Sequence, residues 1–333
     1  MYVKNVCMSR KQKTKTTDVI RAAEGRETIV AGELVTVDFP KGGSPSLLAS
    51  KLFVQLLDQA GADVVKDKAH RVLLADLNWS HRDLDYLAEA VRELQRTVIE
   101  ITVQTANGPR RKSGQFLTDV ERDLDAATGE LMFHFSKTVR QVVRNSTHWA
   151  AVSARAVLAF ECKYSIWLYQ LAALHAHRDQ AGPTFPLDEL RQQMGASAKS
   201  LRIWQNFRNR VLEPAIAEIN QLTGITVDYQ PVKRGRKIEA VRLFCRKKDQ
   251  DELRAAAAEQ ARPKTGRKAR RADLVEQVAA ERRAQQQWVD AKLAEAEAKW
   301  QHRQLDLDDA FDDGHNTDAA FDWQHAQRPN IAE

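Results

Sequence analysis

The stretch NFRNRVLEPAIAEIN, residues 206–220, has the apolar spacing of a packed helix but carries two arginines and three asparagines. Projected at about 100° per residue, it belongs to an amphipathic helix predicted over about residues 199–222. The apolar side of this helix contains Leu201, Trp204, Val211, Leu212, Ala215, Ile219 and Leu222. The exposed side contains Lys199, Arg202, Asn206, Asn209 and Arg210.

The exposed side combines long cationic donors with short amides. These side chains reach the edges of guanine and adenine in the major groove and hold the phosphates beside them. Arg208 maps to the apolar side, so it must either extend along that surface to solvent or lie at a local distortion of the helix. Pro214 predicts a kink after the arginines, because proline removes one helical hydrogen bond.

The segments around this helix complete a winged-helix pattern. A short helix over residues 186–195 and a tight turn precede it, and strands over residues 224–230 and 237–247 follow it. The turn between the strands contains a glycine and a cluster of basic residues, which are Lys233, Arg234, Arg236 and Lys237. This order predicts a recognition helix followed by a basic wing.

Residues 45–150 show the same order less clearly. Helices are predicted over residues 46–60 and 80–95, where Ser80 is the expected N-cap, and strands over 98–105, 114–122 and 129–137. Residues 106–114 are predicted to form a basic turn. The alternating residues Ile99, Ile101, Leu131, Phe133 and Phe135 are expected to pack mainly into the core of this domain.

The sequence therefore predicts an α+β protein with two tandem winged-helix domains and a charged C-terminal tail. The expected parts are a flexible segment at 1–44, winged helices at 45–150 and 151–248, and a tail at 249–333 with an acidic, disordered end. Residues 160–248 hold 15 Lys/Arg against 8 Asp/Glu, a net charge of +7, whereas the chain as a whole carries +6. A basic excess in one domain favours nucleic acid as the partner.

Other features exclude several classes of protein. No run of about 18 apolar residues predicts a membrane span, and the N-terminus lacks the apolar segment of a signal peptide. The three cysteines have no CxxC spacing, which indicates reduced thiols in a cytoplasmic protein. No Walker motif is present, so ATP-driven remodelling is not expected, and the sequence indicates no cofactor, no metal and no catalytic residue.

Over about residues 45–248, the chain resembles a known family, the replication initiators of iteron plasmids. The most specific similarity covers NFRNRVLEPAIAEINQLTG and VDYQPVKRGRKIEAVRLF. The family pattern is matched by Phe207, Arg208 and Arg210, then Glu218, Ile219 and Asn220, then Lys233, Arg234, Gly235 and Arg236. Close relatives often have a third arginine where this chain has Asn209, so the recognised bases should differ.

The resemblance implies a function. Such initiators bind repeated origin sites (iterons) as monomers, promote origin opening and recruit host replication proteins, namely the host initiator and helicase. Dimers of many members repress their own promoter and so contribute to copy control. The C-terminal domain is implied to be the main DNA reader, and the N-terminal domain to dimerise and touch adjacent DNA. We therefore expect a homodimer in equilibrium with monomer, with no membrane partner and no enzymatic activity.

Two alternatives remain open from the sequence. A winged-helix transcriptional regulator without a role in replication would have the same fold. A rolling-circle initiator nuclease would need a metal-binding histidine pair and a tyrosine nucleophile, for which His175, His177 and Tyr229 are candidates. The histidines lie in a predicted helix, where residues two apart point away from each other and cannot share a metal.

Overall fold

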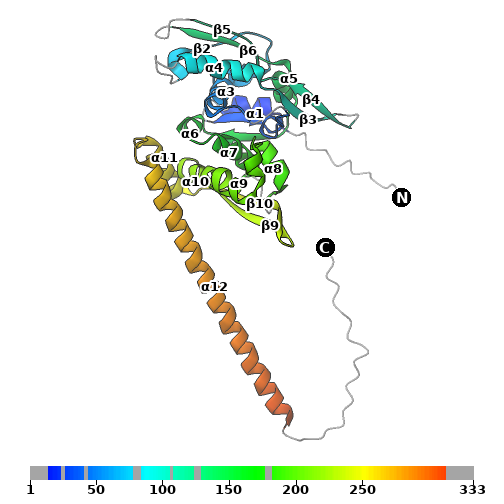
Figure 1. Cartoon of the computed structure of the whole chain (residues 1–333), viewed down its shortest axis with the longest axis vertical. Helices are drawn as coiled ribbons and strands as arrows, with labels where there is room; N and C mark the ends of the chain where they lie inside the picture. Colours follow the sequence, from blue (N-terminus) through cyan, green and yellow to red (C-terminus); the bar gives the residue numbers. More distant parts are fainter. Residues whose placement is uncertain are drawn as a thin grey trace, which may run out of the picture. The chain divides into compact units, whose positions relative to one another are not determined.

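Figure 1 shows the computed structural model, which describes residues 14–23, 27–40, 44–77, 84–105, 108–123, 129–176 and 182–312. The chain forms two compact units, Met1–Ala272 and Asp273–Glu333. The first unit contains both winged helices, in agreement with the predicted α+β class. The domain boundaries at residues 150 and 248 stay predictions.

The first winged helix combines three helices with a small antiparallel sheet. The helices are α3 (Leu47–Ala60), α4 (Leu84–Arg96) and α5 (Lys137–Asn145). The strand order in the sheet is β2 (His70–Leu73), β6 (Glu130–Phe135) and β5 (Leu117–Arg122). Short 3-10 helices, η1 (Gly61–Val65) and η2 (Leu74–Leu77), flank β2. Ser46 caps α3 by accepting from the backbone N–H of Ala49, whereas the expected cap Ser80 lies outside the described residues.

Aromatic rings fill the space between α3 and this sheet. The ring centroid of Phe53 lies 4.5 Å from that of Phe116, and Phe133 meets Phe135 edge to face at 5.2 Å. His70 stacks on Phe133, and burial lowers its pKa, which favours the neutral imidazole. The five alternating residues singled out in the sequence are all 1% exposed or less, so they lie in the core of the unit, as expected.

The described residues of the N-terminal segment differ from the flexible segment expected over residues 1–44. They form α1 (Thr16–Ala23), β1 (Thr28–Ala31) and α2 (Gly32–Val35). Strand β1 pairs antiparallel with β7 (Trp149–Val152). This pairing makes the segment part of the core, where Val30, Ala31, Leu34, Val35 and Val37 are at most 1% exposed.

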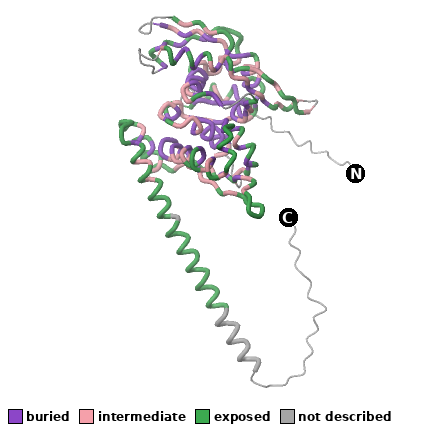
Figure 2. Tube along the Cα trace, viewed as in Figure 1, coloured by how far each residue is buried: buried purple, intermediate pink, exposed green. Residues whose placement is uncertain are grey.

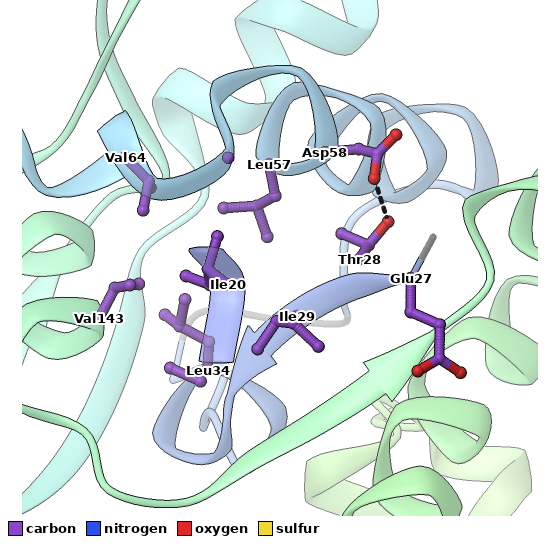
Figure 3. A pocket seen from close by; sticks show the side chains of 11 residues that line it. Ile20, Glu27, Thr28, Ile29, Leu34, Leu57, Asp58, Val64 and Val143 are labelled. Carbon is purple, nitrogen blue, oxygen red and sulfur yellow. Dashed lines mark hydrogen bonds between the residues drawn. The ribbon is translucent and has the colours of Figure 1, made fainter. Parts of the chain in front are cut away.

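A polar contact fixes the start of β1 against α3. Figure 3 shows Thr28 Oγ1 donating to Asp58 Oδ1, and the distance is 2.7 Å. Beside it, Ile20, Ile29, Leu34 and residues of the first winged helix line a cavity of about 40 Å³. The cavity is almost filled by these apolar side chains, so it is a packing feature of the core.

The basic turn predicted over residues 106–114 is instead largely a strand. Strand β4 (Gly108–Gly114) pairs with β3 (Ile99–Thr105) in a two-stranded hairpin, separate from the β2-β6-β5 sheet. A Cβ at Gly114 would lie 2.4 Å from Thr138 Oγ1, so only glycine lets the hairpin approach α5 this closely. Strand β4 lacks apolar alternation because it is an edge strand, and for that reason its sequence resembled a turn.

The second winged helix follows the predicted order. Its helices begin with α6 (Ala154–Ala159), α7 (Lys163–His175) and α8 (Leu187–Gln193). Its sheet has the order β8 (Thr184–Pro186), β10 (Lys237–Lys247) and β9 (Ile225–Arg234). The side chains that pack between the helices and the sheet include Leu190, Phe207, Val211, Ile219 and Val241, all fully buried.

The single helix predicted over residues 199–222 is divided into four pieces. A 3-10 turn, η4 (Lys199–Arg202), is followed by α9 (Trp204–Phe207), the π-helical turn η5 (Arg208–Leu212) and α10 (Glu213–Leu222). The prediction assumed one constant angle per residue, which a wider turn does not obey. The apolar positions still point inward, because Leu201, Val211, Leu212, Ala215 and Ile219 are all buried.

The first part of the predicted tail forms a helix that packs on the second winged helix. Helix α11 (Gln250–Ala261) opens with a capping box between Asp249 and Glu252, and it packs on α10. Gln260 Nε2 donates to the carbonyl of Leu222 at 2.5 Å. The following helix, α12 (Arg267–Asp312), starts inside the first unit, where Arg267 is 2% exposed.

The second unit contains the remainder of α12. Figure 2 colours almost all of its described residues as exposed, as expected for a solvated helix. Glu295 joins Lys292 and Lys299 at 2.8 Å each, and such exposed pairs contribute little stability. The helix continues to Asp312, past the point where an irregular chain was expected, and the end of the predicted acidic segment lies outside the described residues. Among the described helices, none is long and apolar enough to cross a membrane.

Candidate nucleic-acid interface

The helix α8 and the segment after it form a helix-turn-helix. Gly195 ends α8 with φ of 63°, and its N–H donates to the carbonyl of Gln192 at 2.9 Å. A Cβ at Gly195 would lie 2.3 Å from the backbone nitrogen of Ser44, so both conformation and space require glycine here. The turn delivers the chain to Lys199, where the candidate recognition segment begins.

A π-helical turn shapes this segment. The N–H of Glu213 donates to the carbonyl of Arg208, five residues back, instead of to the carbonyl four residues back. Pro214 follows directly and has no N–H to donate to the carbonyl four residues before it, so a regular α-helical ladder cannot continue through this point. The kink predicted from Pro214 is thus a widened turn, and it carries both arginines of the family pattern.

Four of the predicted reading residues are exposed together. They are Lys199, Arg202, Asn209 and Arg210. No hydrogen bond or ion pair within the described part of the chain occupies the side chains of Arg202 and Arg210. These two guanidinium groups are therefore available for phosphates or base edges.

Asn206 and Arg208 have partners within the protein. Asn206 Nδ2 donates to the carbonyl of Ser200 at 2.9 Å, which joins α9 to the preceding 3-10 turn. Arg208 Nε lies 3.1 Å from Asn209 Oδ1 and 3.3 Å from Glu213 Oε1. The guanidinium of Arg208 is thus oriented by a carboxylate within the protein.

Tyr229 contacts the same carboxylate oxygen of Glu213 as Arg208 does. Its hydroxyl donates to Glu213 Oε1 at 3.1 Å, and its ring lies 6.3 Å from that of Trp204. Burial, and then the charge of Glu213, raise the pKa of Tyr229 to about 12, so the hydroxyl stays protonated and remains a donor. Strand β9, α10 and the π turn are joined by this chain of contacts.

Sequence reasoning missed one positioning residue, Arg191 on α8. Its guanidinium lies 5.3 Å from the ring centre of Phe207, and its Nη2 donates to the carbonyl of Arg202 at 2.7 Å. Asp188 accepts from its Nη1 at 2.8 Å. The spacing of Asp188 and Arg191 on one helix was a visible signal of a pair, but the contact with Phe207 depends on the fold.

The wing is a long two-stranded hairpin. Arg234 pairs with Lys237, so Gly235 and Arg236 form its two-residue turn, and Gly235 has φ of 62° with open space around it. Lys233 and Arg234 therefore lie on β9, which continues past the strand predicted to end at residue 230, and Lys237 begins β10, where the second strand was predicted to start. Arg234 Nη1 lies 3.4 Å from Glu239, and all four predicted basic residues are exposed.

The remaining residues of the family pattern are structural. Glu218 is fully buried and accepts from the backbone N–H groups of Glu161 and Cys162 and from the hydroxyl of Ser165. It thereby caps the N-terminus of α7, where a negative charge is favourable. Asn220 exchanges two hydrogen bonds with the backbone of Val227, at 2.7 and 2.9 Å, and aligns α10 with β9.

The candidates for nuclease chemistry do not form a site within the described residues. The ring of His175 packs edge to face on Phe185 at 5.8 Å, while Tyr229 bonds to Glu213. His177 lies outside the described residues. No group of three or more His, Cys, Asp or Glu suited to a metal ion occurs in the described part of the chain.

The fold and the site together define a tandem winged-helix protein with a basic reading surface. Residues 186–244 match the family model described as "Initiator Rep protein, WH2". This match covers α8, the recognition segment and most of the wing, and it confirms the predicted resemblance to replication initiators in the second winged helix.

Two solved structures are similar to the chain. One is the Pi initiator protein in complex with iteron DNA, with 19% identity over 67% of this chain and 98% of that chain, and a TM-score of 0.47. The other is the MSBI1.176 WH1 domain, a replication protein isolated from a multiple sclerosis patient. It has 11% identity over 39% of this chain and 89% of that chain, and a TM-score of 0.25. A comparison with curated protein sequences finds no match. Because both structural likenesses are distant, the resemblance to replication initiators rests on the family match over residues 186–244.

Proposed function

We propose that the protein initiates plasmid replication by binding repeated sites, iterons, in double-stranded DNA at the origin. The observation that supports this most is the exposed pair Arg202 and Arg210, free of partners in the described structure, within the segment that matches the initiator family. Origin opening and recruitment of the host initiator and helicase are part of the proposal, as are a cytoplasmic location and the absence of catalysis.

A footprint on the DNA that flanks the gene tests the proposal. Protection of several direct repeats, spaced by whole helical turns, is the expected result. Protection of a single inverted repeat, with none elsewhere, would favour the alternative, a winged-helix regulator without a role in replication. Autorepression predicts additional protection over the promoter of the gene itself.

The wing is expected to hold phosphates without selecting bases. Neither Lys233 nor Arg236 has a partner in the described structure, so both are available to phosphates. Replacing both with glutamine should lower affinity equally for origin and unrelated duplexes, because phosphates are the same in every sequence. The slope of log affinity against log salt should decrease by about 2, one for each lost phosphate contact. Fluorescence anisotropy at several salt concentrations measures both quantities. A changed site preference with the original salt slope would assign these residues to base reading.

Association should be a reversible monomer–dimer equilibrium. The first winged helix buries its alternating apolar residues in its own core, so its described residues leave no large apolar sheet face that would require an obligate partner. Sedimentation velocity over a hundredfold concentration range should show the weight-average coefficient rising with concentration. A single unchanging species over that range would contradict the equilibrium.

A further inference from the structure

A cavity of about 740 Å³ lies where the first winged helix meets the segment that follows the second. Lys51 and Gln55 of α3 and Tyr86 of α4 line one side. Arg155 of α6 lines it together with Arg262 and Lys264, which belong to the connection between α11 and α12. All these residues belong to the first compact unit, and the volume is that of a site for a small organic ligand.

Among the described residues, those that line the cavity include several cations and no carboxylate. The side chains of Arg155 and Lys264 are exposed and form no ion pair or hydrogen bond in the described structure, while Arg262 lies 3.6 Å from Glu259. Lys51 Nζ donates to the carbonyl of Leu158 at 2.8 Å. Burial, and then the charge of Lys264, lower the pKa of Lys51 to about 8, and the charges of Glu218 and Glu161 act in the opposite direction. A bound anion would offset the repulsion between Lys51 and Lys264.

One neutral group also lacks a partner. Gln55 is 7% exposed, and its Nε2 donates to the carbonyl of Leu77 at 3.0 Å. Its Oε1 is buried without a hydrogen-bond donor among the described residues. A buried amide oxygen is stable when it accepts a hydrogen bond, so the cavity favours a ligand with an N–H or O–H group as well as an anionic end. At the rim, the Tyr86 side chain is 63% exposed and presents an aromatic face.

We propose that this cavity binds a small phosphate ester of the nucleotide class. Arg155, Arg262 and Lys264 hold the phosphates, Gln55 Oε1 accepts from a polar edge of the ligand, and Tyr86 contacts its ring. The ligand would touch residues from both sides of the junction and so couple the first winged helix to the connection behind the second. This inference does not depend on the identity of the DNA site.

The phosphates of DNA are the other possible source of such an anion. Helices α6 and α11 lie on one side of the second winged helix, and the turn of the β9–β10 wing lies on the opposite side (Figure 1). A duplex held by the recognition segment and the wing therefore has its main contacts away from the cavity. A free nucleotide accounts better for a cavity in this position.

Isothermal titration calorimetry on the full chain tests the proposal, with ATP and inorganic pyrophosphate as probes. ATP is expected to give saturable binding of one molecule per chain. The double variant Arg155→Gln, Lys264→Gln should lower the affinity for both ATP and pyrophosphate tenfold or more, because each lost cation removes a charge-assisted hydrogen bond. Tyr86→Ala should lower the affinity for ATP and leave the affinity for pyrophosphate unchanged. The control is Arg71→Gln, Arg254→Gln, which removes the same charge at exposed positions outside the cavity lining and should bind ATP normally.

Three outcomes would overturn the proposal. ATP could give no saturable heat, or the control variant could lose as much affinity as the cavity variant, which would indicate non-specific attraction to a basic protein. An unrelated duplex could displace ATP, and the cavity variant could bind that duplex tenfold more weakly. These two results together would assign the cavity to DNA phosphates. Thermal unfolding of each variant confirms that lost binding is not lost folding.

Discussion

Arg210→Ala is expected to weaken binding to the protected origin site by about 1–3 kcal/mol and to relax selection at one or two base pairs. Arg210 is exposed on the π turn, and its guanidinium has no partner in the described structure. The protein therefore loses no internal contact when the side chain is removed, and the measured change reports the DNA contact. Anisotropy with the origin site and with single-base variants of that site measures both effects.

Arg208→Ala tests the second arginine of the recognition segment, which Glu213 already orients within the protein. Arg208 is already held by Glu213, so the variant should lower affinity while leaving Glu213 without its cation. Arg254→Ala, an exposed arginine on α11, is the matched control and should leave DNA binding unchanged. If Arg210→Ala and Arg208→Ala both keep the affinity and the base preference of the original protein, the recognition segment does not read DNA.

The second large effect concerns stability. Glu218→Gln is expected to lower the free energy of unfolding by about 3–5 kcal/mol, because it removes the charge from one partner of a buried ion pair. Glu218 is fully buried, and Arg271 Nη2 lies 3.1 Å from its Oε1. The lost charge also weakens the cap on α7, and it leaves the largely buried guanidinium of Arg271 without its closest carboxylate.

Urea unfolding measures this loss as a decrease in the midpoint at constant slope. Glu121→Gln, at an exposed position on β5, removes the same charge, is the control and should shift the midpoint little. Arg271→Gln should be destabilising too, and the double variant should lose less than the sum of the two single changes, since both remove the same pair. An unshifted midpoint in Glu218→Gln would show that α7 and α10 are held together by apolar packing alone.

Local patterns in the sequence were sufficient to predict the helices and strands that bury one face. The apolar spacing of α3, α4, α8 and α10 is that of amphipathic helices, and the alternation in β6 and β10 is that of half-buried strands. The basic turn of the wing follows from Gly235 and its neighbours, because a two-residue hairpin turn needs a residue that tolerates positive φ. These features depend on residues close in the chain, so they can be predicted without knowing the fold.

Only the tertiary structure decided the features that join distant segments. Strand β1 pairs with β7, and Glu218 meets Cys162 and Arg271, through contacts that no local spacing encodes. The same holds for the cavity of Lys51 and Lys264, which forms only when α3 meets the connection after α11. The π turn is intermediate: Pro214 marked the place, but the conformation depends on Arg208, Glu213 and Tyr229 packing together. A sequence pattern reports which side of an element avoids water, whereas the partner of each side is set by the free energy of the whole packed chain.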